Sequence, residues 1–169
     1  IVAGTPIYSE GFNGASMPAG WTRTNITTGA PFPAEADWTL RPSGYATNGN
    51  TIVSNDNSQF FLSNSDDVCT ISCGSVVSST TLTSAPFDLS NPLLVTASLS
   101  FWEYFRSIAG SDTTEILIST DGVTFFSLSP PATGNIGTQN NFSNTVLDLS
   151  PYIGNATVYI QFKYDSTWD

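Results

Sequence analysis

The sequence predicts an all-β domain in which two antiparallel sheets pack face to face as a sandwich. Short β-prone runs recur along the 169 residues, and segments rich in Gly, Pro and Asn separate them. Apolar stripes with a period of 3.6 residues are absent, which predicts almost no helix. About nine strands without helical crossovers favour two antiparallel sheets over an α/β fold.

The segment 97–106 has the clearest strand pattern. Leu99 and Phe101 alternate with serines, as expected for a strand with one buried face. We expect the aromatic residues that follow to lie on the buried face and Glu103 on the solvent face.

Two further segments are strong strand candidates. Residues 115–120 and 123–128 flank Asp121-Gly122, a dipeptide typical of hairpin turns. The segment 157–164 places four apolar residues on one face: Val158, Ile160, Phe162 and Tyr164. Weaker strands are expected at 6–12, 38–41, 59–63, 80–84 and 145–149, with loops at 44–57 and 130–144.

Composition excludes several classes of protein. Charged residues make up only 11% of the chain, too few for a coiled coil or a charged disordered tail. The net charge of −10 disfavours nucleic acid and anionic lipid, because binding to either depends on cations. No apolar run approaches the ~20 residues that cross a bilayer. We therefore expect no nucleic-acid partner and no direct membrane insertion.

The chain contains no histidine. Its absence removes the usual Ser-His-Asp and Cys-His catalytic groups and the common zinc sites. Paired carboxylates can hydrolyse glycosides, but the sequence does not fix the distance between any pair of its 14 acidic residues. We therefore expect no enzymatic activity.

Cys69 and Cys73 are the only cysteines. Their spacing allows a small disulfide loop in an oxidising compartment, and the alternative is two free thiols.

Acidic side chains in the loops at 64–67 and 112–115 suit calcium, which binds oxygen ligands. The alternative is that these are solvated turn residues.

The four tryptophans divide into two pairs. Trp21 and Trp102 lie in or beside apolar runs, and we expect both in the core. The pattern does not decide whether Trp38 and Trp168 are buried, and both are candidates for stacking against a glycan.

Eight short segments resemble one known family, in the correct order and over nearly the whole chain. They are YSEGF (8–12), MPAGWT (17–22), FLSNSD (61–66), TLTSAPFDLS (81–90), LSFW (99–102), EILISTDG (115–122), LDLSPYIG (147–154) and YIQF (159–162). Together they resemble the cleaved-adhesin family of gingipain haemagglutinin regions and the related choice-of-anchor J domains. These are MAM-like jelly rolls of secreted Bacteroidetes proteins.

The resemblance implies a function and a metal. It implies a jelly-roll sandwich, stabilised by calcium, that serves as an extracellular or cell-surface adhesion module and is exported by type IX secretion. The implied partners are a host or surface protein, a glycan, or neighbouring copies of the chain. The implied calcium ligands are Glu10, Asp66, Asp112 and Glu115. Asn13 stands where the family often has a further acid.

Residues 1–169 are expected to form one domain that stops before the last strand of the family. Either the chain is a fragment of a longer polypeptide or a neighbouring subunit supplies a strand. The second case describes a structural subunit of an extracellular filament. A further alternative is a carbohydrate-binding module attached to a hydrolase.

Two short segments, DTT at 112–114 and DST at 165–167, resemble the sequence that Bacteroidetes O-glycosylate. They make Thr113 and Ser166 candidate glycosylation sites. Three N-glycosylation sequons, at Asn25, Asn141 and Asn155, have meaning only where a eukaryotic-type pathway exists.

Overall fold

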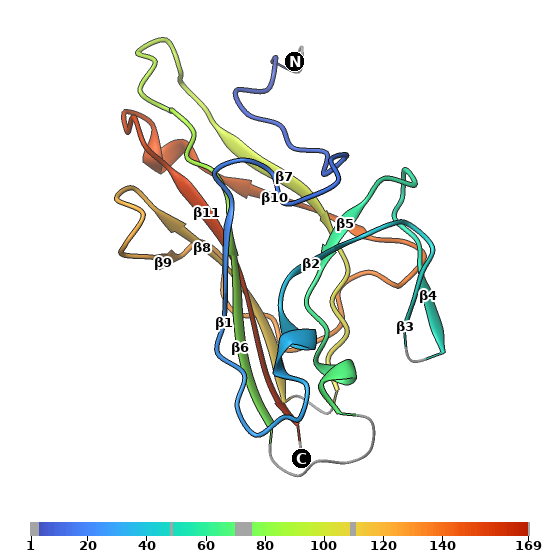
Figure 1. Cartoon of the computed structure of the whole chain (residues 1–169). Helices are drawn as coiled ribbons and strands as arrows, with labels where there is room; N and C mark the ends of the chain where they lie inside the picture. Colours follow the sequence, from blue (N-terminus) through green and yellow to red (C-terminus); the bar gives the residue numbers. More distant parts are fainter. Residues whose placement is uncertain (1–3, 48, 70–75, 109–110, 169) are drawn as a thin grey trace.

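The computed structural model describes residues 4–47, 49–69, 76–108 and 111–168. These residues form antiparallel strands and three short 3-10 helices (Figure 1). The strands are β1 Thr22–Asn25, β2 Thr39–Arg41, β3 Tyr45–Thr47, β4 Asn50–Ile52, β5 Phe60–Leu62, β6 Val76–Thr83, β7 Ser98–Glu103, β8 Asp112–Ser119, β9 Phe126–Ser127, β10 Ser143–Asp148 and β11 Tyr159–Trp168. The 3-10 helices are η1 Pro33–Ala36, η2 Ser65–Val68 and η3 Ser150–Tyr152.

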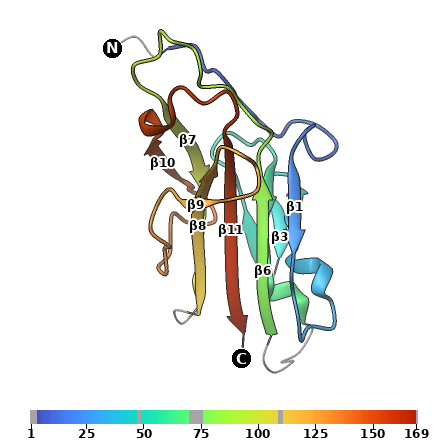
Figure 2. The same ribbon diagram turned by 90° about the vertical axis from the view of Figure 1, so that its left-hand side faces the viewer.

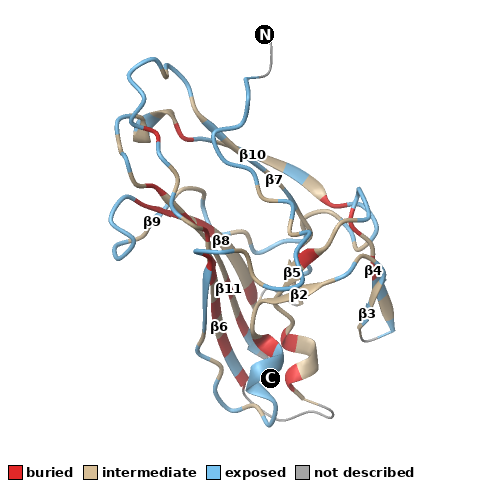
Figure 3. Cartoon of the chain, turned by 45° about the horizontal axis from the view of Figure 1, so that its top comes forward, coloured by how far each residue is buried: buried red, intermediate tan, exposed pale blue. Residues whose placement is uncertain are grey.

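The first layer is a five-stranded sheet in the order β1-β6-β11-β8-β9 (Figure 2). Its central strand, β11, pairs with β6 on one side and with β8 on the other. Val158, Ile160 and Tyr164 are buried on the face that the sequence predicted, and Figure 3 shows buried residues along β6, β8 and β11. Strict alternation therefore placed the apolar face of β11 correctly.

The second layer consists of two-stranded ribbons. β7 pairs with β10, and β2 pairs with β5, while β3 and β4 form a hairpin at the side (Figure 1). Leu99 and Phe101 of β7 pack with Leu147 of β10 against buried residues of β8 and β11. The ring centroids of Phe101 and Phe162 are 5.1 Å apart, in an edge-to-face contact between the layers. The prediction of an all-β fold with antiparallel sheets is confirmed.

The predicted hairpin around Asp121 is present between β8 and β9. The Asp121 carboxylate accepts hydrogen bonds from the Ser119 hydroxyl and from the backbone N–H groups of Val123 and Thr124. These bonds stabilise the ionised carboxylate, led by the bond from Thr124, and lower the pKa of Asp121.

The strand predictions fail in three places. No strand was expected at Thr22–Asn25, which forms β1 and pairs with β6. The segment from Pro6 to Phe12 forms no strand, because a β-strand needs a neighbouring strand and none of the described residues pairs with it. The expected loop at 44–57 contains the hairpin of β3 and β4, in which Thr47 pairs with Asn50. The sequence between those residues is Asn-Gly, the strongest short hairpin signal.

The side-chain directions predicted at the end of β7 are wrong. Trp102 is 59% exposed, and Glu103 is partly buried on the inner face. Since successive side chains in a strand point to opposite faces, Trp102 must lie on the same side as Ser98 and Ser100. The expectation of a core position for Trp21 agrees with the structure, in which it is 8% exposed.

Candidate binding groove and outer sheet face

A groove of about 1490 Å³ lies between the two layers and is called the interlayer groove below. Its apolar floor is formed by side chains of β6, β8 and β11, namely Leu82, Ile116, Ile160 and Phe162. One wall consists of every residue from 96 to 106, including all of β7. Strand β5 and the segment Gly4–Glu10 also line the groove. The groove is therefore apolar at its base and follows a complete strand along its side.

The edge of β7 that faces away from β10 is paired with no other strand of the described residues. On the other edge, the Ala97 carbonyl accepts a hydrogen bond from the Leu149 N–H at 2.9 Å. Because backbone groups of alternate residues point to the same edge, those of Ser98, Ser100 and Trp102 point away from β10. Among the described residues, β10 is the only strand paired with β7.

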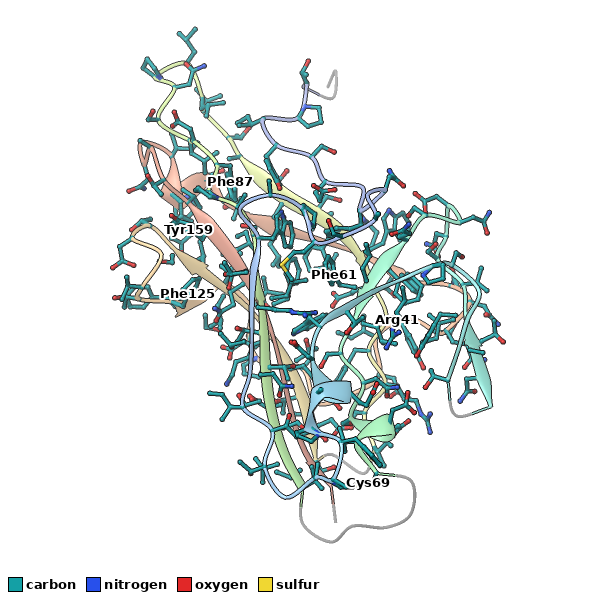
Figure 4. The ribbon with its side chains drawn as sticks, viewed as in Figure 1. Arg41, Phe61, Cys69, Phe87, Phe125 and Tyr159 are labelled. Atoms are coloured by element: carbon teal, nitrogen blue, oxygen red, sulfur yellow. The ribbon has the colours of Figure 1, made fainter. Side chains whose placement is uncertain are left out.

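Aromatic contacts hold the N-terminal segment beside the groove. Tyr8 stacks on Phe87 with centroids 6.1 Å apart, and its hydroxyl accepts a hydrogen bond from Trp21 Nε1 at 2.7 Å. Phe12 makes edge contacts with Trp21 and Phe61, at 5.3 and 5.1 Å. Figure 4 shows Phe61 and Phe87 on separate parts of the chain that these contacts join. Side chains, rather than backbone pairing, thus fix this segment.

One end of the groove is polar. Asp112 is 3% exposed and accepts a hydrogen bond from the Ile108 N–H at 3.0 Å. The Tyr164 hydroxyl is hydrogen-bonded to Ser65 Oγ at 2.7 Å. Burial, reinforced by the charges of Asp112 and Asp66, raises the pKa of Tyr164 to about 12. Asp66 and Asp112 therefore lie near the same buried phenol.

The four predicted calcium ligands do not form one site. Asp112 points inward from β8, whereas Glu115, three residues later, lies on the opposite face and is paired with Lys163. Glu10 accepts a hydrogen bond from the Phe12 N–H at 2.7 Å. No three His, Cys, Asp or Glu side chains in the described residues come together around one point.

Asp66 and Asp112 are the two candidates that come closest to a shared site. Arg106 already supplies a cation there, with Nη1 at 3.7 Å from Asp66 Oδ2. Calcium takes six to eight oxygen ligands, so this pair of carboxylates does not fit a complete calcium site.

Glu103 also lines the groove, although the sequence suggested that it faces solvent. Burial raises its pKa above the usual range of a glutamate, and a hydrogen bond from the Thr145 hydroxyl opposes part of that shift. Strict alternation along β7, applied without regard to residue type, would have placed Glu103 on the inner face and Trp102 on the outer face.

The outer face of β7 and β10 is a second candidate surface and is called the outer sheet face below. Trp102 and Val146 are exposed there, at 59% and 62%. The pairing of β7 with β10 makes them diagonal neighbours, because Val146 lies opposite Ser100 and Trp102 lies opposite Asn144. The Asn144 amide donates a hydrogen bond to Ser100 Oγ at 3.1 Å. The face thus combines an exposed indole with uncharged polar groups.

The other glycan-stacking candidates do not form such a face. Trp38 is partly buried in the wall of the groove, and its indole N–H has no hydrogen-bond acceptor. The side chain of Trp168 lies outside the described residues.

The predicted modification sites have different surroundings. Thr113 is partly exposed, whereas the Ser166 hydroxyl is buried and inaccessible in the folded domain.

Of the two cysteines, Cys69 is disulfide-bonded. Cys73 lies outside the described residues.

Comparison with known proteins identifies no family. No protein-family model matches the chain, and no curated protein matches it. The described part of the chain has no helix of the length and apolarity needed to cross a bilayer.

Proposed function

We propose that the chain is an extracellular adhesion or binding module with a jelly-roll-type sandwich, and that it binds its partner through the outer sheet face. The observation that carries the proposal is the exposure of Trp102 on the outer side of the two-stranded sheet of β7 and β10. Tryptophan is among the residues that contribute most to binding energy, because a large apolar surface becomes buried at little cost in conformational entropy.

The neighbours of Trp102 favour an uncharged partner. Ser98, Ser100 and Asn144 supply hydroxyl and amide groups on the same face, and Val146 extends its apolar area. The only acid on these strands that shares the face is Asp148, at one end. A neutral protein surface satisfies these groups without the desolvation of buried charges.

The same face favours a second candidate function, carbohydrate binding. The apolar C–H face of a pyranose can stack on an indole ring while its hydroxyls bond to Ser and Asn side chains. The carbohydrate-binding alternative then rests on Trp102 rather than on Trp38.

Substitution of Trp102 tests both functions. We expect Trp102→Ala to weaken binding to the preferred surface protein or glycan at least tenfold, which corresponds to about 1.4 kcal/mol. The measurement is binding of the labelled domain to a glycan array and to a panel of immobilised extracellular proteins.

Phe126→Ala is the matched control, because Phe126 is 64% exposed on β9 in the other layer. It should retain wild-type binding. Equal binding by Trp102→Ala and the wild type, or an equal loss in the control, would contradict a site on the outer sheet face.

Calcium stabilisation stays a prediction from the family resemblance. It requires a higher Tm in millimolar calcium than in chelator, because a ligand that binds only the folded state stabilises it. Asp112→Asn should reduce that difference if the buried carboxylate contributes an oxygen ligand. Identical melting curves with calcium and chelator would contradict the prediction.

A further inference from the structure

We propose that Arg41 binds the carboxylate of an acidic sugar, a uronic acid, with the help of the Tyr45 hydroxyl. Arg41 is the last residue of β2 and Tyr45 the first residue of β3. Neither strand belongs to the ribbon of β7 and β10, so the site is separate from the outer sheet face and does not depend on Trp102.

The balance of charges supplies the first argument. The chain has four cationic side chains and 14 acidic ones. Arg23, Arg106 and Lys163 each form an ion pair with an aspartate, at N–O distances of 3.1, 3.7 and 2.7 Å. Arg41 forms no ion pair and donates no side-chain hydrogen bond within the described part of the chain. Despite the excess of acids, folding therefore leaves one guanidinium free to bind an external anion.

A tight turn places this guanidinium against an aromatic ring. The Tyr45 N–H donates a hydrogen bond to the Pro42 carbonyl at 3.2 Å, and Gly44 has a φ of 84°, the positive φ that a type II turn has at its third residue. Arg41 and Tyr45 flank the turn, and Arg41 Cζ lies 4.4 Å from the centroid of the Tyr45 ring. Figure 4 shows Arg41 on the side of the molecule that carries the β3–β4 hairpin.

Packing beneath the pair holds it in place. Tyr45 packs against the buried cluster of Ile52, Phe60 and Phe142, and Arg41 lies opposite Phe60 in the pairing of β2 with β5. A guanidinium that is already stacked loses less conformational entropy when it binds a ligand. The site is thus organised before a ligand arrives.

The donors that face solvent fit a carboxylate. Arg41 Nε is buried and inaccessible, but neither Nη atom is among the buried unpaired atoms, so both reach solvent. The Tyr45 hydroxyl is likewise accessible and has no hydrogen bond to a described residue. Two adjacent Nη donors match the two oxygens of a carboxylate, and a phenol hydroxyl can donate to or accept from a sugar hydroxyl.

The net charge selects among carboxylate ligands. At −10 the chain repels polyphosphates and densely acidic peptides, and one free guanidinium neutralises one negative charge. A uronic acid carries a single carboxylate on a ring of otherwise uncharged hydroxyls. It therefore satisfies both Arg41 and Tyr45 without adding charge that the rest of the surface opposes.

NMR titration of the whole chain with sodium glucuronate, at constant ionic strength, tests the proposal. Backbone amides of the turn, those of Ser43, Gly44 and Tyr45, should shift and reach saturation. Glucose is the uncharged counterpart and should have a dissociation constant at least tenfold higher, because it offers no carboxylate to the guanidinium. Sodium acetate supplies the carboxylate without the sugar and should also bind more weakly than glucuronate.

Substitutions assign the binding to these two side chains. Arg41→Gln should weaken glucuronate binding at least tenfold, and Arg41→Lys, which keeps the charge but loses the paired donors, should also weaken it. Lys163→Gln is the matched control, because it removes the same charge from β11 in the other layer and should bind as the wild type does. Tyr45→Phe should weaken binding of glucuronate but not of acetate.

Five results would overturn the proposal: equal binding of glucuronate and glucose, acetate binding as tightly as glucuronate, unchanged binding in Arg41→Gln, an equal loss in Lys163→Gln, or tighter binding of a polyglutamate peptide than of glucuronate. If Arg41→Gln does not fold, the comparison of Arg41→Lys with Lys163→Gln decides instead. Trp102→Ala should leave glucuronate binding unchanged, so failure of this site and failure of the outer sheet face are distinguishable.

Discussion

Replacement of Trp21 by alanine should destabilise the domain by about 3–5 kcal/mol, the usual cost of removing a large buried aromatic side chain. Trp21 is buried, packs against Phe12 and Phe61, and donates a hydrogen bond to Tyr8. It therefore connects the N-terminal segment to β5. Urea unfolding, followed by far-UV circular dichroism and by tyrosine fluorescence, measures the change.

Tyr8→Phe separates the packing of Trp21 from its hydrogen bond. The phenylalanine keeps the stack on Phe87 but leaves the Trp21 N–H without its acceptor, which should cost about 1–2 kcal/mol. An equal loss in the two variants would mean that the hydrogen bond, not the aromatic packing, fixes the segment. A loss below about 1 kcal/mol in Trp21→Ala would contradict the role of the cluster.

The alternation of apolar and polar residues was sufficient to predict the buried face of a strand that has neighbouring strands on both edges. β11 lies between β6 and β8, and its alternation gave the buried face directly. It failed at the segment 6–12, whose composition favours a strand but whose pairing depends on a partner elsewhere in the chain. Strand formation is a property of the pair, so a single segment cannot decide it.

The errors at Trp102 and Glu103 have a different origin. Both residues were assigned by side-chain type, apolar inward and charged outward, instead of by their positions in the alternation. The predicted calcium set contains the same kind of error, since Asp112 and Glu115 are an odd number of residues apart on one strand. Period-two geometry, applied without regard to residue type, separates both pairs.

The interlayer groove could not be predicted from the sequence. Its lining combines the N-terminal segment with β5, β7 and residues of three strands in the other layer. Each contribution looks like ordinary core or strand sequence by itself. Only the relative placement of these distant segments brings their side chains together around one groove.

Alanine substitutions at two isoleucines of β8 should measure how the groove differs from the packed core. Ile118 is fully buried in the main cluster, whereas Ile116, on the same face, also lines the groove. Ile118→Ala should cost about 4 kcal/mol, because closely packed neighbours cannot collapse into the space. Ile116→Ala should cost about 2 kcal/mol, since part of its surface has no packed neighbour to lose.

Urea unfolding of the two variants measures both costs. Equal costs at Ile116 and Ile118 would contradict the view that the groove leaves part of Ile116 without packed neighbours.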